Sequence, residues 1–359
     1  MTAPRARSVA STIGAEVILL ARLDDVRWMT GFTGGTGWAV FDKSACRGVL
    51  MVDGRYGERA MAEVANSGAP FDVEVSSTSH DDRLSAFVGS RTVAVDPTQV
   101  SAARMSAVRA RSAVVEEPSP LDELRRTKDP VEISHMERAA AIADAALAEV
   151  VADGLCGRTE RQIRNRLEML MRESGADEPA FPTIVATGAN GARPHHEPGD
   201  AVVCDGDAVV IDMGARVSGY RSDMTRTVLV GRVDDEMIDM FNTVTRAQAA
   251  GLATVRTGVA GSEVDGACRA VFREVGCEHE FLHGTGHGVG LAIHEHPILG
   301  PRCATTLLSS EVVTVEPGLY RVGSGGVRIE DLVVVEEHGH RLLTRTPKDL
   351  TCPPSARMI

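Results

Sequence analysis

The chain reads VVIDMG at residues 209–214 and DMTRTVLV at residues 223–230, and this pair of stretches decides the fold class. A similar pair reads VTVEPG at residues 313–318 and VRIEDLVVV at residues 327–335. In each pair, a β-branched strand ends in an acid and a glycine, and a second strand follows with an acid near its start. This spacing predicts two β-hairpins and a pseudo-twofold domain.

Four acids of this pattern lie in or beside strongly apolar strands: Asp212, Asp223, Glu316 and Glu330. An unpaired charge is costly to bury in such strands. Four carboxylates in one cleft cannot all stay ionised unless cations neutralise them. The sequence therefore predicts a divalent-metal site in this domain.

A histidine-rich segment, HEFLHGTGHGVGLAIHEHP at residues 279–297, lies between the two strand pairs and holds five of the eleven histidines. We expect His283, His287 and His294 at the site, because the glycines in this frame let the backbone approach a ligand closely. We expect His279 and His296 to be structural.

A pair of adjacent histidines, His195 and His196, lies in a turn-rich loop before the first acidic strand. Neighbouring side chains of an extended segment point in different directions. We therefore expect one of the two rings in the cleft and the other at its rim.

The first 120 residues alternate short β-rich runs with helical ones, which predicts an α/β domain. Strands are expected at residues 16–20, 37–41, 48–53, 71–75 and 92–96, and helices at 56–65 and 102–110. The glycine-rich stretch at 31–37 lacks the lysine of a phosphate loop and precedes a strand, so it is expected to be a simple loop.

The turn-rich sequence EEPSP at residues 116–120 predicts a domain boundary near residue 120. Beyond it, a long helix is expected after Asp129 and Pro130. A second helix is expected over residues 159–173, with Thr159 as its N-cap.

Length and charge restrict the classes of protein. At 359 residues the chain is too long for one ordinary core, so two domains are expected. A net charge of −12 argues against a nucleic-acid partner, which needs a basic face. No apolar run approaches the ~20 residues of a membrane span. Seven scattered cysteines without a C-x-x-C pair and no signal peptide favour the cytoplasm.

Several motifs together resemble the pita-bread dinuclear metallopeptidases: DMG at 212–214, SDMTRT at 222–227, GTGHGVG at 284–290, VEPG at 315–318 and GVRIED at 326–331. The stretches WMTGF at 28–32, DGRY at 53–56 and LRRTKDPVE at 124–132 are similar to the Xaa-Pro aminopeptidase and Xaa-Pro dipeptidase (prolidase) branch. The resemblance implies a creatinase/prolidase-like α/β domain over residues 1–120. It also implies an α+β pita-bread (creatinase/aminopeptidase-like) catalytic domain over residues 121–359.

The resemblance also implies two divalent metal ions and assigns their ligands. Asp212 would bind one metal, Asp223 and Glu330 would bridge both, and His287 and Glu316 would complete the shell of the other. This oxygen-rich set favours Mn²⁺, with Co²⁺, Fe²⁺ or Zn²⁺ as alternatives.

The implied activity is hydrolysis of the peptide bond that precedes proline by a metal-bridging hydroxide. Glu316 would take up the proton and deliver it to the leaving nitrogen, and His294 would stabilise the oxyanion. His195 would contact the substrate, and His283 would line the cleft.

Two further residues are expected to support the ligating carboxylates. Arg328 lies two residues before Glu330, and hence on the same face of the strand. Thr225 lies two residues after Asp223 on the other acidic strand.

One position departs from the family pattern. A small prolidase would carry an arginine after the proline of its His-Glu-x-Pro segment, to bind the free carboxylate of a dipeptide, whereas this chain has Ile298 after Pro297. Dipeptidase and aminopeptidase activities therefore both stay open. A hydrolase of a small non-peptide amide and a non-catalytic pita-bread binding protein are the alternatives from other classes. The resemblance also implies a homodimer.

Overall fold

The computed structural model describes residues 2–77 and 80–354. The chain divides into two compact units, Met1–Arg125 and Arg126–Ile359, where the sequence analysis placed the boundary near residue 120.

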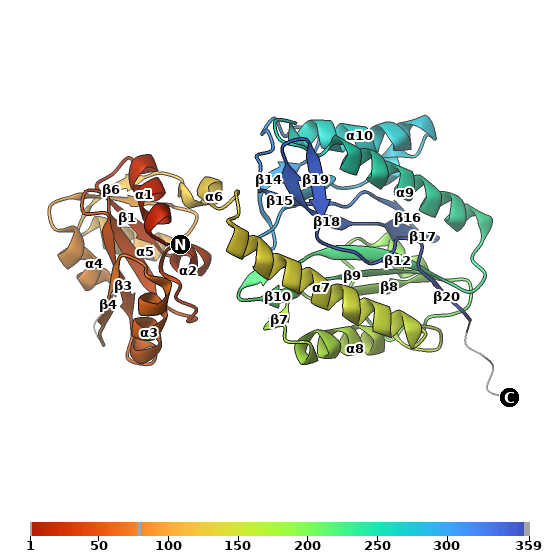
Figure 1. The fold of residues 1–359 in the computed structure, drawn as a ribbon, viewed down its shortest axis with the longest axis horizontal. Coiled ribbons are helices and arrows are strands. Elements are labelled where there is room, and N and C mark those ends of the chain that lie inside the picture. Colours follow the sequence, from red (N-terminus) through yellow and green to blue (C-terminus); the bar gives the residue numbers. More distant parts are fainter. Residues whose placement is uncertain (1, 78–79, 355–359) are drawn as a thin grey trace. The chain divides into compact units, whose positions relative to one another are not determined.

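The first unit contains one six-stranded mixed sheet with the strand order β4-β3-β2-β1-β5-β6 (Figure 1). Its strands are β1 Val17–Leu20, β2 Trp38–Asp42, β3 Arg47–Val52, β4 Phe71–Val75, β5 Thr92–Val95 and β6 Ala113–Glu116. Its helices are α1 Thr2–Thr12, α2 Leu23–Thr30, α3 Gly57–Ser67, α4 His80–Val88, α5 Ala102–Arg109 and α6 Leu121–Leu124. Apolar side chains of α4 and α5 pack on the face of the sheet that carries Val17 and Leu19.

The five predicted strands and two predicted helices of this unit are confirmed to within two residues, and residues 31–37 contain no helix or strand. The α/β class is therefore confirmed. Helices α1, α2, α4 and α6 and strand β6 were not predicted. In α1 only a narrow face is apolar, with Ala6 and Val9 fully buried, so its sequence lacks a clear helical pattern.

The second unit is an α+β domain in which strands lie between two pairs of helices (Figure 1). Its helices are α7 Pro130–Ala152, α8 Glu160–Glu173, α9 Asp235–Thr254 and α10 Gly261–Glu274. Its strands are β7 Glu178–Pro179, β8 Ile184–Thr187, β9 Ala208–Met213, β10 Ala215–Val217, β11 Tyr220–Arg221, β12 Met224–Val230, β13 Gly286–Gly288, β14 Glu295–Leu299, β15 Val312–Val315, β16 Gly318–Arg321, β17 Gly325–Arg328, β18 Asp331–Glu336, β19 Gly339–Leu342 and β20 Thr351–Cys352.

Both predicted helices of this unit are confirmed, together with their starts. Asp129 caps α7, which has Pro130 at its first position. Thr159 caps α8 by accepting a hydrogen bond from the Gln162 amide. Both are capping boxes, which satisfy the free N–H groups of the first turn. Helices α9 and α10 were not predicted.

The two predicted strand pairs are also confirmed. Strands β9 and β12 pair antiparallel, with Asp212 opposite Thr225. Strands β15 and β18 pair in the same way, with Val315 opposite Asp331. Each connection holds a further antiparallel pair that the sequence analysis did not predict, β10 with β11 and β16 with β17.

Each half of the unit has its own core. Helices α7 and α8 pack against β9 and β12, with Ile211 and Leu147 fully buried. Helices α9 and α10 pack against the strands of the other half, with Val313 and Val333 fully buried. These apolar cores position the strands whose ends carry the acids. No helix within the described residues is long and apolar enough to cross a membrane.

Candidate metal centre

A cleft of about 520 Å³ lies in the second unit, at the ends of the acidic strands. All five expected ligands line it: Asp212, Asp223, His287, Glu316 and Glu330. They come from β9, from the residue before β12, from β13, from the residue after β15, and from the connection between β17 and β18. The fold thus brings together residues that are more than 100 positions apart.

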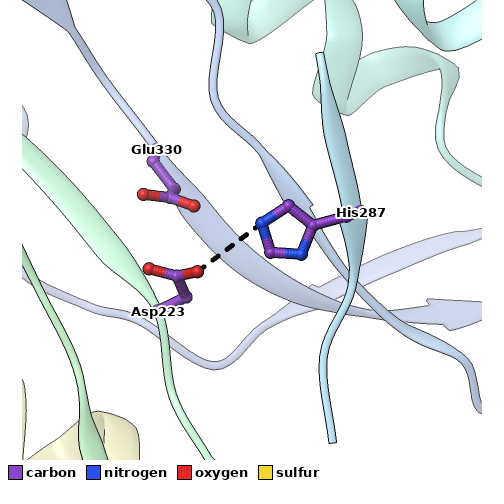
Figure 2. Close-up of side chains that lie close together, drawn as sticks. All are labelled: Asp223, His287 and Glu330. Atoms are coloured by element: carbon purple, nitrogen blue, oxygen red, sulfur yellow. Dashed lines mark ion pairs between the residues drawn. The ribbon is translucent and has the colours of Figure 1, made fainter. Parts of the chain in front are cut away.

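Three of these side chains form a tight group (Figure 2). Ligand atoms of Asp223, His287 and Glu330 all lie within 4.8 Å of one another. His287 Nε2 is 3.7 Å from Asp223 Oδ2 and 3.4 Å from Glu316 Oε1. One imidazole nitrogen and carboxylate oxygens at this spacing are suitable ligands for a divalent cation.

The Asp212 carboxylate provides an independent test of whether a cation fits. Its Oδ2 accepts a hydrogen bond of 2.7 Å from Arg328. Its Oδ1 is buried and has no hydrogen-bond partner within the described part of the chain. A buried carboxylate oxygen without a partner is costly, and coordination of a cation would satisfy it.

The charges of the group fit the same conclusion. Burial, and then repulsion from neighbouring carboxylates, raises the pKa of Asp223 and of Glu330 well above the usual range. Burial also raises the pKa of Asp212, and that of Glu316 to about 8. Without cations Glu316 would therefore keep its proton at neutral pH, and the pKa values of the other three acids are shifted in the same direction. Bound divalent ions would favour the ionised form of all four.

Burial lowers the pKa of His287 to about 4, so its imidazole is neutral at pH 7. Its Nδ1 donates to the Gly288 carbonyl at 3.0 Å, because a carbonyl oxygen can only accept. This bond leaves the lone pair of Nε2 directed at the carboxylates, which is the usual arrangement of a metal-ligating histidine.

Two threonines hold the acidic ligands in place. Thr225 Oγ1 donates to Glu330 Oε2 at 2.7 Å. Thr314 Oγ1 donates to Glu316 Oε1 at 3.2 Å. Thr225 was predicted from the sequence, whereas Thr314, one residue before the end of β15, was not.

Arg328 is almost fully buried beside the ligands. Besides its bond to Asp212, its Nε donates to Thr225 Oγ1 at 3.0 Å. Its Nη1 donates to the Tyr320 hydroxyl, also at 3.0 Å. Arg328 therefore fixes Asp212 and Thr225 together. Tyr320 was missed by the sequence analysis, because nothing in the GLY sequence of residues 318–320 indicates that its hydroxyl faces a cleft.

His283 lines the cleft, yet both of its ring nitrogens are engaged. Its Nδ1 donates to the Gly284 carbonyl at 2.8 Å, and its Nε2 accepts from the Tyr320 hydroxyl at 2.7 Å. Its ring therefore holds Tyr320, and through it Arg328. His283 thus lines the cleft as expected, and its hydrogen bonds favour a positioning role.

The other histidines divide into two groups. His294 and His195 line the cleft and are exposed in it. The His294 ring packs edge-on against His287, with ring centres 4.4 Å apart. His279 and His296 are exposed and are not among the residues that line the cleft.

His196 lines the cleft together with His195. Its side chain is only 10% exposed, and its Nε2 donates to the Glu160 carboxylate at 2.8 Å. The two adjacent rings nevertheless differ as expected, one in open contact with the cleft and one bound to the protein.

A cleft of this kind, with buried carboxylates, one neutral histidine and two similar strand pairs, defines a metal-dependent hydrolase. The chain belongs to metallopeptidase family M24, whose model matches residues 134–337. The model of the creatinase/prolidase N-terminal domain matches residues 4–127.

Relatives match over nearly the whole chain. An uncharacterized peptidase, YqhT, from Bacillus subtilis is 36% identical over 358 residues, which is 98% of this chain and 99% of the relative. The structure of an Xaa-Pro dipeptidase from Bacillus anthracis superposes with a TM-score of 0.92 at 33% identity, over 98% of this chain and 99% of that one. That of an X-Pro aminopeptidase from Thermotoga maritima gives a TM-score of 0.87 at 31% identity, over 96% and 99%.

Proposed function

We propose that the chain hydrolyses the peptide bond on the amino side of proline, in dipeptides or at the N-terminus of longer peptides. The observation that carries the proposal is the buried group of Asp223, His287 and Glu330, with the unsatisfied Asp212 oxygen in the same cleft. The dipeptidase and aminopeptidase relatives support the choice of substrate. Turnover of Xaa-Pro and Xaa-Pro-Yaa peptides by metal-loaded protein tests it.

The residues that would hold two divalent ions are Asp212, Asp223, His287, Glu316 and Glu330. Mn²⁺ is the first choice for a set with one nitrogen and several oxygens, ahead of Co²⁺, Fe²⁺ and Zn²⁺. Such ions would polarise the scissile carbonyl and make a water nucleophilic at neutral pH.

Three side chains act on the substrate in this proposal. Glu316 takes up a proton from the attacking water and delivers it to the leaving nitrogen. The hydrogen bond from Thr314 holds the Glu316 carboxylate in place for this step and for binding metal. His294 donates a hydrogen bond to the oxygen on which negative charge develops. His195, whose ring is exposed in the cleft, binds the peptide backbone.

The rest of the cleft suits a proline side chain. Proline has no N–H, so a site for it needs apolar surface in place of a hydrogen-bond acceptor. Phe181, Ile184, Ile293 and Ile298 line the cleft and offer such surface. A small non-peptide amide would gain less from this apolar wall. A non-catalytic binding protein would not require all five ligands.

Substrate length is tested at Ile298, whose exposed fraction is 43% although it is large and apolar. It pairs with His287 across β13 and β14, so the two side chains share the cleft face. We expect Ile298→Arg to raise kcat/KM for Xaa-Pro dipeptides at least about tenfold relative to Xaa-Pro-Yaa peptides, because a charge-assisted hydrogen bond contributes about 1.5–3 kcal/mol. Steady-state kinetics on both substrates measures this ratio.

The control is Ile298→Met, which keeps an apolar side chain of similar size. An equal shift of the ratio in Ile298→Met, or none in Ile298→Arg, would count against a missing carboxylate site as the basis of the length preference.

We further propose that the protein is a cytoplasmic homodimer. The scattered cysteines and the family resemblance support this assignment. Sedimentation of the purified protein measures the oligomeric state.

A further inference from the structure

A buried carboxylate outside the cleft accepts hydrogen bonds from a chain segment that lines it. Glu160 is the first residue of α8, and its exposed fraction is 0%. Its Oε1 accepts from the Thr187 amide and from Asn190 Nδ2, each at 2.9 Å. Its Oε2 accepts from His196 Nε2 at 2.8 Å and from the Gly199 amide at 2.9 Å. One carboxylate thus takes four donors.

All four donors belong to one stretch of chain, residues 187–199, which we call the 187–199 segment. It runs from the last residue of β8 through the 3₁₀ helix Gly188–Ala192 and then follows the cleft. Backbone bonds join its far end to the same helix start, since the Arg161 amide donates to the Gly199 carbonyl at 3.0 Å. The first turn of α8 therefore holds both ends of the segment.

The middle of the 187–199 segment forms part of the cleft wall. Pro194, His195 and His196 line the cleft. The Pro194 carbonyl accepts from Arg328 Nη1 at 3.4 Å, which ties the segment to the arginine that also donates to Asp212. The segment is also packed closely at Gly191, where an added Cβ would meet the backbone of Gly326 at 3.0 Å. His195 lies between Pro194, which Arg328 contacts, and His196, which Glu160 holds.

A carboxylate suits this position better than any neutral side chain. Burial by itself would raise the pKa of Glu160, but hydrogen bonds from His196, Thr187, Gly199 and Asn190 outweigh burial and lower it. An amide has one accepting oxygen and one donating nitrogen. In either orientation, a glutamine at this position would turn its N–H groups toward a backbone amide donor, that of Thr187 or that of Gly199.

We propose that Glu160 is a positioning residue, which fixes the 187–199 segment and thereby sets the place of His195 against the substrate. The inference rests on the proposed function for the part that concerns substrate, but not for the part that concerns the segment. Glu160 itself does not line the cleft, so it would act only through the residues that it holds.

The test is a double-mutant cycle of Glu160→Gln with His195→Ala. We expect Glu160→Gln to lower kcat/KM for Xaa-Pro-Yaa about 10–100-fold, with a larger rise in KM than fall in kcat, because it loosens a residue that supports the site. In the His195→Ala background, the same change should lower kcat/KM by less than about threefold. Metal content should stay that of the parent protein, because Glu160 contacts none of the ligands.

Glu132→Gln is the matched control. Glu132 is a buried carboxylate in the first turn of α7, where it accepts from the Asp129 amide and from the Tyr220 hydroxyl. It does not line the cleft. We expect Glu132→Gln to lower the melting temperature but to leave kcat/KM within about twofold of the parent value, because the substitution is remote from the cleft. Equal fold-losses from Glu160→Gln with and without His195 would overturn the proposal, because they would indicate a purely structural role.

Hydrogen exchange separates this inference from the proposed function. Residues 187–199 should exchange faster in Glu160→Gln than in Glu132→Gln, whatever the substrate is. If residues 187–199 exchange faster in Glu160→Gln but the parent protein cleaves no Xaa-Pro peptide, only the proposed function is contradicted. If their exchange rate is unchanged in Glu160→Gln, the role of Glu160 is contradicted. If Glu160→Gln does not fold, Asn190→Ala removes one of the four donors. It should then give a smaller loss of kcat/KM that again disappears in the His195→Ala background.

Discussion

Glu316→Gln is expected to lower kcat for Xaa-Pro hydrolysis by about 10²–10⁴-fold, which is the range that a positioned general acid or base contributes. The glutamine keeps the size of the side chain and its bond from Thr314, which lies 3.2 Å away. It cannot take up a proton. Steady-state kinetics on an Xaa-Pro-Yaa peptide, with the bound metal measured in the same samples, gives the effect.

Glu336→Gln is the matched control for this change. Glu336 is an exposed acid at the end of β18 and does not line the cleft. Its replacement should leave kcat within about twofold, because surface changes are usually nearly neutral. If metal-loaded Glu316→Gln keeps more than about a tenth of kcat, Glu316 is not the proton carrier.

The metal-free chain is expected to lose stability as pH rises from about 6.5 to about 8. Burial raises the pKa of Glu316 to about 8, against a usual value of 4.5. A folded-state pKa above the unfolded one means that the folded chain binds more protons, so this contribution is full below about pH 4.5 and is lost as pH rises toward 8. The pKa values of Asp223 and Glu330 are also raised, which acts in the same direction.

The histidines fix the lower end of this window. Burial lowers the pKa of His283 and of His287 to about 4 from the usual 6.5. Their contribution is present above pH 6.5 and is lost as pH falls, so it is constant within the window. The change in the free energy of unfolding between about pH 6.5 and 8 therefore comes from the acids.

For Glu316 alone, the free energy of unfolding should fall on the order of 2 kcal/mol across the window. Thermal unfolding in chelator at several pH values measures this fall. With Mn²⁺ bound, the acids are already ionised, and the pH slope should vanish or reverse. Glu316→Gln should flatten the slope of the metal-free chain. If the melting temperature of the metal-free chain stays level or rises over this pH window, the acids are not a buried group that needs cations.

The features of the fold that local sequence determines were predictable. The strand pair of Asp212 and Asp223 and that of Glu316 and Glu330 were visible as β-branched runs broken by an acid and a glycine. The start of α8 was visible in the capping residue Thr159. The family resemblance supplied the rest of the architecture, and the pita-bread class is confirmed by the match of residues 134–337.

The residues that support the site were harder to find, because their roles depend on contacts far along the chain. From the sequence, Glu160 is an ordinary acid in the first turn of a helix, where acids are common because the helix N-terminus carries a partial positive charge. Only the fold brings Asn190 and His196 to it. Tyr320 reads as a strand residue, although its hydroxyl joins His283 to Arg328.

The role of His283 could not be read from its sequence frame either. The glycines around it suggested a residue that meets a ligand. The geometry instead uses both ring nitrogens within the protein. A side chain whose hydrogen-bonding groups are all engaged is better suited to hold its neighbours than to bind substrate.

The central claim, metal-dependent cleavage before proline, is tested most directly by adding metals back to chelator-treated protein. Xaa-Pro dipeptides and Xaa-Pro-Yaa peptides are incubated with the metal-free chain and with Mn²⁺, Co²⁺ or Zn²⁺, and bound metal is counted. The account predicts no turnover without metal, two ions bound per chain, and release of the residue before proline once Mn²⁺ is present. Turnover in chelator with no metal bound, or no hydrolysis of either peptide class with any metal, would contradict it.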